Sequence, residues 1–525
     1  MKKKIVILFC ILCASLILSE VVFAIDHSTN ISQDETWDTG GNPHNILGVI
    51  SVIGNATLTI NPGVEVRFNP GCSLLIGITG INSSPGKLIA SGTDTQKIIF
   101  TSNSPNPLPG DWNAISFQPT ASDDSVIENA IIEYGGGSLG ILRINGSNPT
   151  IRNCTVRYSA NSGIRLDSST AEISNCTIED NALYGADCDG FSGALDGNLF
   201  TNNGSYPISL YSRNTPSPVV NIQNNFASNN PDQVYFNPGS GIDFDYTFIN
   251  FGIPYFLPGN LNVINNATLT INPGVEVQFI TGSSLLIGIS NSPGRLIAIG
   301  TDTQKIIFTS NSPNPLPGDW NGIYFYITAE DDSVIENAII EYGGGTFGNL
   351  RINGSNPTIR NCTVRYSANY GIYLTGSSAV ITCSDIMQNQ IGIYATLSNP
   401  TISQNNFSNN INWGIYNTSA SMIINAKYNW WGDVSGPSGA STGFGDAVSE
   451  YVAYYPWFLA ISDCTFCMGD FEPDGDVDGK NFAEFVFHYG CLNNCGVFDL
   501  TGDGSVNSDD LGALALYFGR NNCSQ

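Results

Sequence analysis

A run of oxygen-bearing residues near the C-terminal end of the sequence has the spacing of a calcium-binding loop. Counted from Asp499, such residues stand at loop positions 1, 3, 5, 7, 9 and 12, with a glycine at position 6. Ca²⁺ is a hard cation that prefers several oxygen ligands, and the glycine allows the sharp turn that gathers them. The apolar segment 511–518 that follows predicts a short helix. The predicted ligands are Asp499, Thr501, Asp503, Ser505 through its carbonyl, Asn507 through a water, and Asp510.

A second loop of the same kind begins 29 residues earlier, and the segment 482–489 that follows it again predicts a helix. Its predicted ligands are Asp470, Glu472, Asp474, Asp476, Asp478 and Asn481. Two features depart from the pattern, because position 12 is Asn481 and Glu472 at position 3 precedes Pro473. We therefore predict two calcium sites and leave the affinity of this first one open.

Paired carboxylates elsewhere in the chain are candidates for acid–base chemistry, since glycoside hydrolysis uses two carboxyl groups across a groove. The candidate pairs are Asp123 with Asp124, Asp331 with Asp332, and Asp187 with Asp189. Adjacent residues point to opposite faces of a strand, and the two adjacent pairs have turn-forming neighbours, so we interpret them as solvated turn carboxylates. Asp187 and Asp189 would share one face of a strand, which leaves a cation site open as the alternative.

Arginine and aromatic residues recur at matched positions and offer two further kinds of site. Arginines that could serve as a lyase base are Arg143, Arg157 and Arg165, repeated as Arg351, Arg365 and, in the third place, Tyr373. We interpret these arginines as polar residues on an outer face. The aromatic candidates for stacking on sugar rings are Trp112, Phe117, Tyr134 and Tyr158, repeated as Trp320, Phe325, Tyr342 and Tyr366. For Trp112 and Phe117 we favour packing in the interior.

The elements that would carry these residues follow from an internal duplication. Residues from about 46 to 200 recur as about 257 to 405, and segment 92–113 recurs unchanged as 300–321. A shorter period of 21 or 22 residues lies beneath it, for example between Gly371 and Gly392 or between Ile151 and Ile173. Short segments alternate apolar and polar residues and end in Asn or Gly turns. This pattern predicts a parallel β-helix, whose coils of three short strands stack about 4.8 Å apart.

The predicted fold is therefore all-β over most of the chain. We expect a β-helix over residues 25–458, in duplicated halves of about 46–256 and 257–458, with roughly 17–18 coils. A small α-helical loop–helix calcium module is expected over 464–525. Trp430 and Trp431 should cap the last coil, because an open apolar end would aggregate. The three histidines, His27, His44 and His488, are expected to lie outside the coils.

Composition excludes several classes of protein, and the first residues predict where the protein is located. The chain has 19 Lys and Arg against 45 Asp and Glu, a net charge of −26, which argues against nucleic-acid binding. With 56 Gly, 26 Pro and 42% hydrophobic residues, neither a helical bundle nor a disordered acidic chain fits. Residues 1–24 combine a basic start, an apolar run and a small residue at Ala24, as in a secretory signal peptide. No later stretch predicts a membrane span, so we expect a secreted or cell-surface protein.

Residues 45–458 resemble the right-handed parallel β-helix repeat proteins that bacteria export. The resemblance rests on ATLTINPGVEV at 56–66, GDW at 110–112, IENAIIEYGG at 127–136, NWWGD at 429–433 and YPWF at 455–458. Many such proteins are polysaccharide lyases, hydrolases or epimerases, so the resemblance implies a polysaccharide-related function. The motifs of the pectin hydrolases and alginate epimerases are absent, which favours binding over catalysis.

Residues 464–523 resemble a dockerin, a module of two calcium loop–helix halves related by a pseudo-twofold axis. Each loop keeps Val at position 8 and an apolar residue at position 13. Dockerins attach secreted polysaccharide-active proteins to cohesin-bearing scaffolds, so the resemblance implies a cohesin-type partner. The partner-reading positions 10 and 11 would be Gly479 and Lys480 in one half and Ser508 and Asp509 in the other, an asymmetric pair.

The cysteines of the tail bracket these two halves. In an exported protein such spacing predicts disulfides. We expect one between Cys467 and Cys491 and one between Cys495 and Cys523, with Cys464 left free.

The sequence thus predicts an exported β-helix protein that binds or scaffolds polysaccharide and is attached through its calcium module. One alternative is a polysaccharide lyase or glycoside hydrolase delivered by the same module. Another is an adhesin-like surface protein whose calcium module is only structural.

Overall fold

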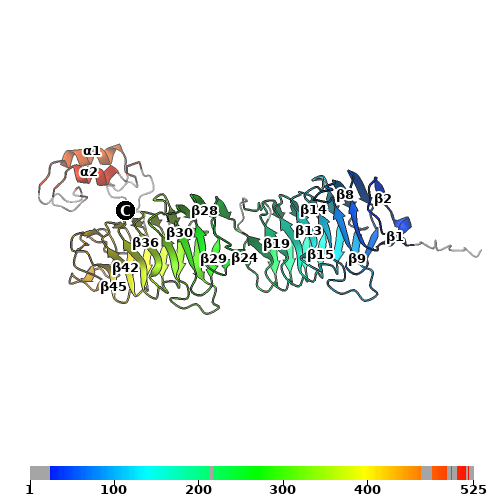
Figure 1. Cartoon of the computed structure of the whole chain (residues 1–525). Helices are drawn as coiled ribbons and strands as arrows, with labels where there is room; N and C mark the ends of the chain where they lie inside the picture. Colours follow the sequence, from blue (N-terminus) through cyan, green and yellow to red (C-terminus); the bar gives the residue numbers. More distant parts are fainter. Residues whose placement is uncertain are drawn as a thin grey trace, which may run out of the picture.

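The computed structural model describes residues 24–211, 217–221, 223–289, 291–462, 476–492, 498, 500, 505–515, 518 and 519. Its main part is a long rod of stacked coils, about 17 turns, followed by two short helices (Figure 1). The predicted all-β parallel solenoid is confirmed. Within the described residues, no helix is long and apolar enough to cross a membrane.

Five parallel sheets, named here A to E, form the sides of the rod. Sheet A contains β1 (Ile25–His27), β3 (His44–Ile46), β6 (Glu65–Phe68), β9 (Ile98–Ser102), β12 (Ala130–Glu133), β15 (Thr155–Arg157), β18 (Thr177–Glu179), β21 (Leu199–Thr201) and β23 (Asn225–Ala227). Sheet B contains β4 (Val49–Val52), β7 (Ser73–Ile76), β10 (Ala114–Phe117), β13 (Gly140–Asn145), β16 (Ser162–Asp167), β19 (Ala186–Asp189), β22 (Ile208–Tyr211), β24 (Val234–Asn237), β26 (Tyr255–Leu257), β29 (Glu276–Phe279), β32 (Ile306–Ser310), β35 (Ala338–Glu341), β38 (Thr363–Arg365), β41 (Asp385–Met387) and β44 (Asn406–Ser408). Sheet C contains β2 (Glu35–Trp37), β5 (Ala56–Ile60), β8 (Gly86–Ser91), β11 (Val126–Glu128), β14 (Thr150–Arg152), β17 (Glu172–Ser174) and β20 (Ala194–Asp196).

The other two sheets belong to the second half of the rod. Sheet D contains β25 (Tyr246–Phe248), β28 (Ala267–Ile271), β31 (Gly294–Ile299), β34 (Val334–Glu336), β37 (Thr358–Arg360), β40 (Val380–Thr382), β43 (Thr401–Ser403), β46 (Ile424–Asn425) and β49 (Val452–Ala453). Sheet E contains β27 (Leu261–Val263), β30 (Ser284–Ile287), β33 (Gly322–Phe325), β36 (Gly348–Asn353), β39 (Tyr370–Thr375), β42 (Ile391–Thr396), β45 (Trp413–Asn417), β48 (Gly445–Val448) and β47 (Pro437–Gly439).

The alternation of apolar and polar residues along each strand builds the core of the rod. In β5, Ala56, Leu58 and Ile60 are buried while the threonines between them are half-buried. Ile151 and Ile173, one period apart, pair in register and are both fully buried. Apolar side chains therefore stack along the axis, and each coil buries the apolar face of the next.

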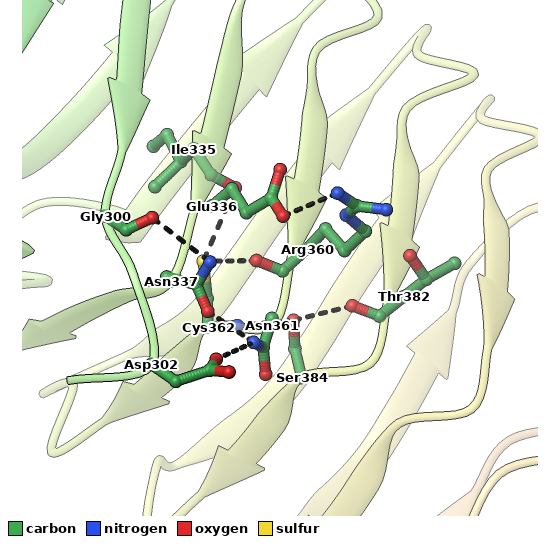
Figure 2. A network of polar contacts seen from close by, with 10 residues as sticks. All are labelled: Gly300, Asp302, Ile335, Glu336, Asn337, Arg360, Asn361, Cys362, Thr382 and Ser384. Atoms are coloured by element: carbon green, nitrogen blue, oxygen red, sulfur yellow. Dashed lines mark hydrogen bonds and ion pairs between the residues drawn. The ribbon is translucent and has the colours of Figure 1, made fainter. Parts of the chain in front are cut away.

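Polar turns join the strands at the corners of the rod, and Figure 2 shows one of them. The side-chain amide of Asn361 donates to the Oδ1 atoms of Asn337 and Asp302, and Asn337 Nδ2 donates to the carbonyl of Gly300 over 3.2 Å. Asn337 and Asn361 have φ values of 51° and 53°, the left-handed region expected for turn asparagines. These bonds satisfy the backbone where the chain leaves one sheet for the next.

Equivalent strands of the two copies lie on different sides of the rod. β6 and β29 are equivalent in sequence, yet β6 belongs to sheet A and β29 to sheet B. Likewise β7 lies in sheet B and its equivalent β30 lies in sheet E. Among the described strands, only sheet B runs through both copies. Equivalent surfaces of the two copies therefore do not form one continuous face.

The N-terminal end of the rod contains two of the histidines, so the prediction that they lie outside the coils is wrong for His27 and His44. They lie on β1 and β3, the first strands of sheet A. His27 Nε2 lies 3.0 Å from His44 Nδ1, and the ring centroids of His27 and His44 are 4.2 and 5.0 Å from that of Trp37. These strands alternate inward and outward residues as the later strands do. The coils therefore begin closer to the N-terminus than the clearest sequence repeats.

A ladder of buried asparagines near the C-terminal end of the rod stops at a carboxyl group. Asn389 Nδ2 donates to Asn410 Oδ1 over 3.1 Å. Asn410 in turn donates to Asp446 Oδ2 from its backbone nitrogen over 3.1 Å and from Nδ2 over 2.6 Å. Burial raises the pKa of Asp446 to about 6, although these hydrogen bonds act in the opposite direction.

The raised pKa predicts that the last coils lose stability as the pH rises. Because the folded pKa of Asp446, about 6, exceeds the usual 3.8, its stabilising effect is complete below pH 3.8 and is lost as the pH rises through 6. Asp446→Asn keeps an acceptor for Asn410 and removes the charge. At neutral pH we expect the opening free energy of the last coils to be about 2 kcal/mol higher in the variant. Amide hydrogen exchange of residues 405–453 measures it, and the difference should vanish in acid; equal exchange at neutral pH would contradict the assignment.

The C-terminal tail contains α1 (Gly479–His488) and α2 (Ser508–Ala515). Its described residues form a separate small core of Val477, Phe485, Leu500, Val506 and Leu514. The backbone N–H of Gly490, after α1, donates to the carbonyl of Val506, and that of Gly519 donates to Val477. The two halves therefore exchange equivalent hydrogen bonds, as a pseudo-twofold arrangement requires.

Both helices begin earlier than the apolar segments predicted. The Asp478 side chain accepts from Lys480 N over 2.7 Å, and the Asn507 side chain accepts from Asp509 N over 2.7 Å. Loop position 9 thus caps each helix, so loop positions 10 to 12 form its first turn.

Candidate functional site

A column of aromatic side chains crosses the outer surface of sheet E. The strands β33, β36, β39, β42 and β45 place Tyr324, Arg351, Tyr373, Tyr394 and Tyr416 in register. Their neighbours along each strand, such as Ile372 and Leu374, are fully buried, so the column lies on the outer side of sheet E. Tyr373, Tyr394 and Tyr416 are partly exposed there, whereas Tyr324 at the start of the column is only 7% exposed. The rings of Tyr373 and Tyr394 stack with centroids 5.3 Å apart and planes 6° apart.

Further rings widen this column. Tyr370 lies 4.7 Å from Tyr394, and Trp413 lies 5.2 Å from Tyr416, measured between ring centroids. The guanidinium of Arg351 lies 3.9 Å from the centroid of Phe347. We call this surface the aromatic face; it consists of the partly exposed residues Phe347, Arg351, Tyr370, Tyr373, Tyr394, Trp413 and Tyr416.

The sequence analysis missed the aromatic face, although a signal for it was present. Tyr373, Tyr394 and Tyr416 each follow a Gly-Ile pair of the short repeat, 21 and 22 residues apart. Such spacing places residues at the same position of successive coils. The aromatic candidates named from the sequence lie instead in the segments that both copies share.

The equivalent column of the first copy, on sheet B, is polar. Arg143, Arg165, Asp187 and Ser209 stand in register there. Arg165 lies 2.6 Å from Asp167, 2.5 Å from Asp187 and 3.3 Å from Asp189. The positive group between Asp187 and Asp189 is therefore this guanidinium, and the alternative of a bound cation is wrong. Burial raises the pKa of Asp187, and Arg165 opposes that shift.

Arg157 differs from the other two candidate arginines because it lies on sheet A. It forms ion pairs with Glu133 at 2.7 Å and Glu179 at 3.8 Å. Arg365 repeats the first pair with Glu341, also at 2.7 Å. The interpretation of these arginines as polar residues on outer strand positions is confirmed, but they do not line one face.

The aromatic candidates named from the sequence divide into two groups. Trp112, Phe117, Trp320 and Phe325 are buried, which confirms packing and removes them from any sugar-binding surface. Tyr134 and Tyr158 remain partly exposed and stack on each other with centroids 5.1 Å apart. Tyr342 and Tyr366 repeat that distance in the second copy. Trp431 is fully buried against Phe407 in the last coils, as a cap requires.

The adjacent acidic pairs are exposed turn carboxylates, as predicted. Asp123 accepts from the backbone and side chain of Asn148 at 2.8 and 3.0 Å. Asp331 does the same with Asn356 at 2.7 and 2.9 Å. These carboxylates hold one turn against the next coil, so neither pair spans a groove.

The structure describes half of each predicted calcium loop. Asp476, Asp478, Asn481, Ser505, Asn507 and Asp510 are described, whereas Asp470, Glu472, Asp474, Asp499, Thr501 and Asp503 lie outside the described residues. Position 12 is fully buried in both loops and accepts a hydrogen bond from the backbone nitrogen of position 9. That bond runs from Asp478 to Asn481 Oδ1 over 2.8 Å and from Asn507 to Asp510 Oδ2 over 2.9 Å. Among the described residues, no group of three or more His, Cys, Asp or Glu side chains could hold a metal ion.

The chemistry of position 12 differs between the two loops. A carboxylate such as Asp510 has a second oxygen that suits Ca²⁺, whereas the other atom of the Asn481 amide is a nitrogen. That nitrogen is buried, with no hydrogen-bond partner among the residues described. At position 12 the second loop therefore offers Ca²⁺ the better ligand.

The predicted partner-reading residues are all exposed. Gly479 and Lys480 lie in the first turn of α1, and Ser508 and Asp509 lie in the first turn of α2. A hollow of about 390 Å³ is lined by Phe482, Leu511, Leu514, Ala515 and Phe518. The rings of Phe482, in the first turn of α1, and of Phe518, after α2, lie 6.2 Å apart between centroids.

The cysteines of the tail are only partly described. Cys491 is disulfide-bonded, and Cys464, Cys467, Cys495 and Cys523 lie outside the described residues. The predicted connectivity stays a prediction. The signal peptide prediction also falls outside, because description begins at Ala24.

Comparison with protein families supports the solenoid. A family model described as a right handed beta helix region matches residues 110–230. A second, described as a pectate-lyase like beta helix domain, matches residues 244–376. No curated protein matches the chain. The first matched region lies within the first half of the rod, and the second lies mostly within the second half.

Proposed function

We propose that this chain, a right-handed parallel β-helix repeat protein, binds a polysaccharide on the aromatic face of sheet E. The observation that carries the proposal is the outward column of tyrosines on successive coils. A sugar ring has an apolar C–H face that packs on a flat aromatic ring, while its hydroxyls stay in water at the edges. Coils about 4.8 Å apart repeat such rings along the axis, so an extended chain can contact several of them.

Binding to polysaccharides is tested directly by affinity gel electrophoresis. The intact protein is run through gels that contain one polysaccharide each, drawn from neutral and acidic polymers. We expect retardation by at least one of them and none in a gel without polymer. Unchanged mobility in every gel would remove the proposal.

Catalysis on the same scaffold is the second candidate, and the match of residues 244–376 to a pectate-lyase like domain favours it. Arg165 is a candidate base in a cluster of charges, but three carboxylates already surround its guanidinium. Incubation with the same polysaccharides, followed by assays for new unsaturated or reducing ends, distinguishes the two candidates. New ends would establish an enzyme, and bound but intact polymer would support binding alone.

The tail is proposed to be a dockerin-like calcium module that attaches an exported protein to a cohesin-type partner. Support comes from the exchanged hydrogen bonds of its halves and from the exposed residues at the two helix starts. When bound, Ca²⁺ would neutralise the acidic loops and hold each loop against its helix. Capture by immobilised cohesins in Ca²⁺, and its loss in EDTA, would support attachment. Calcium-dependent folding without capture would instead indicate a structural cap, as in an adhesin-like protein.

The difference at position 12 predicts that one substitution strengthens the first calcium site. Asn481→Asp supplies the carboxylate that Asp510 supplies in the second loop and keeps the acceptor for Asp478 N. We expect about tenfold tighter Ca²⁺ binding at the first loop, since affinity in such loops follows ligand charge. Isothermal titration calorimetry should resolve two affinities that converge in the variant. Asp510→Asn is the matched control and should weaken the second site; a variant with both affinities unchanged would contradict the role of position 12.

A further inference from the structure

The aromatic face ends at a hollow in the last coils of the rod. This hollow, about 550 Å³, lies beside Trp413 and Tyr416 and is also lined by Asn417, Thr418, Ser449 and Glu450. Trp413 and Tyr416 are the last two rings of the aromatic face. The stacking surface therefore leads into a concave site.

The wall of the hollow is built by the chain as it closes sheet E. β48 pairs with β45 through Ile415 and Val448, and β47 pairs with β48 beyond it. Gly439 of β47 has a φ of 84°, and a Cβ there would lie 3.0 Å from the Trp413 ring and 2.5 Å from the Val448 carbonyl. A larger residue would be strained and would push on the ring. The wall is thus fitted closely to Trp413.

Glu450 is the charged residue among those that line the hollow. The backbone nitrogen of Asn417 donates to Ser449 Oγ over 2.8 Å, and the Asn417 amide donates to the carbonyls of Met422 and Tyr451 at 2.7 and 2.9 Å. These polar groups already form hydrogen bonds within the wall of the hollow. The Glu450 side chain is exposed and has no hydrogen bond or ion pair among the described residues. A carboxylate accepts hydrogen bonds from neighbouring hydroxyls with both oxygens.

We propose that the hollow binds the terminal unit of an uncharged glycan chain, whose preceding units stack along the aromatic face; this rests on the proposed function. Trp413 would pack on the apolar face of the terminal sugar, and the Glu450 carboxylate would accept hydrogen bonds from its hydroxyl groups. An acidic sugar is disfavoured, because its carboxylate would meet that of Glu450 on a chain of net charge −26. The cation of the aromatic face, Arg351, lies several coils away, over the Phe347 ring.

The test titrates the intact protein by calorimetry with linear neutral oligosaccharides and with uronic acid oligosaccharides of equal length. We expect the neutral series to bind more tightly. Glu450→Gln should weaken binding of short neutral oligosaccharides about tenfold, the cost of one charge-assisted hydrogen bond. Trp413→Ala should weaken it at least as much. Binding of a long polymer should change less in both variants, because the other rings remain.

The outcomes separate this site from the aromatic face. If both variants bind short oligosaccharides as the parent does, while Tyr373→Ala/Tyr394→Ala does not bind, the terminal site is overturned and the aromatic face stands. Tighter binding of the uronic acid series would overturn the assignment to an uncharged glycan. If the parent protein binds no glycan, both proposals fail.

Discussion

Replacing Tyr373 and Tyr394 by alanine together is expected to reduce polysaccharide affinity by at least a hundredfold. These two rings form the centre of the aromatic face, stacked 5.3 Å apart and flanked by Tyr370 and Tyr416. Removing a central aromatic contact costs about 2 kcal/mol, or roughly thirtyfold in affinity for each ring. Both side chains point outward between buried neighbours, so the fold should survive. Affinity is measured by calorimetry with whichever polysaccharide retards the parent protein.

The matched control is Tyr342→Ala/Tyr366→Ala. This pair lies in the same copy of the rod, is also partly exposed, and stacks with centroids 5.1 Å apart. It belongs to the end of strands in sheet B and not to sheet E. We expect the control to bind like the parent. Equal losses in both double variants would show that surface tyrosines matter in general, against a specific role of the aromatic face.

Removal of Ca²⁺ is expected to unfold the tail and to leave the rod intact. The described residues of the tail form their own small core, and a module of about 60 residues buries only about 60% of the surface of its unfolded chain, so it is marginally stable alone. Residues 456–525 contain 11 acidic and 2 basic residues, which repel one another without a cation. In such modules the free energy of metal binding is largely free energy of folding. We expect no such dependence in the rod, since its coils bury apolar ladders along the axis.

Calorimetric scans with and without EDTA measure this difference. We expect two transitions in Ca²⁺, of which only the smaller disappears in EDTA, and its return when excess Ca²⁺ is added. The control is Asp446→Asn, which alters the rod and should leave the calcium-dependent transition unchanged. A scan identical in Ca²⁺ and in EDTA would contradict a calcium-stabilised tail.

The interior of the rod could be predicted from sequence because burial has a strict period. Ile151 and Ile173 stand one period apart and pair in register, and Trp112 and Phe117 pack inside as expected. The sheet that each strand of the second copy joins could not be predicted. Coils differ in length, with long connections such as 77–85 and 103–113, so counting residues does not say which sheet a strand joins.

The candidate site was harder to predict because it depends on which sheet each strand joins. Tyr373 and Tyr394 are visible in the sequence as a spacing, but a continuous face exists only once β39 and β42 pair in register. Arg165 could not be recognised as the cation between Asp187 and Asp189, because they come from different coils. In the tail, side-chain caps at Asp478 and Asn507 decided where the helices begin, and apolar periodicity does not report caps.

Footprinting of tyrosines by hydroxyl radicals, with and without bound polysaccharide, locates the binding face directly. We expect protection of Tyr373, Tyr394 and Tyr416 on sheet E. We expect no protection of Tyr184, Tyr206 and Tyr235, which form a second ring cluster with centroids 5.1 to 6.4 Å apart on the first half of the rod. Protection of that second cluster with sheet E left unprotected would contradict the assignment of the binding face.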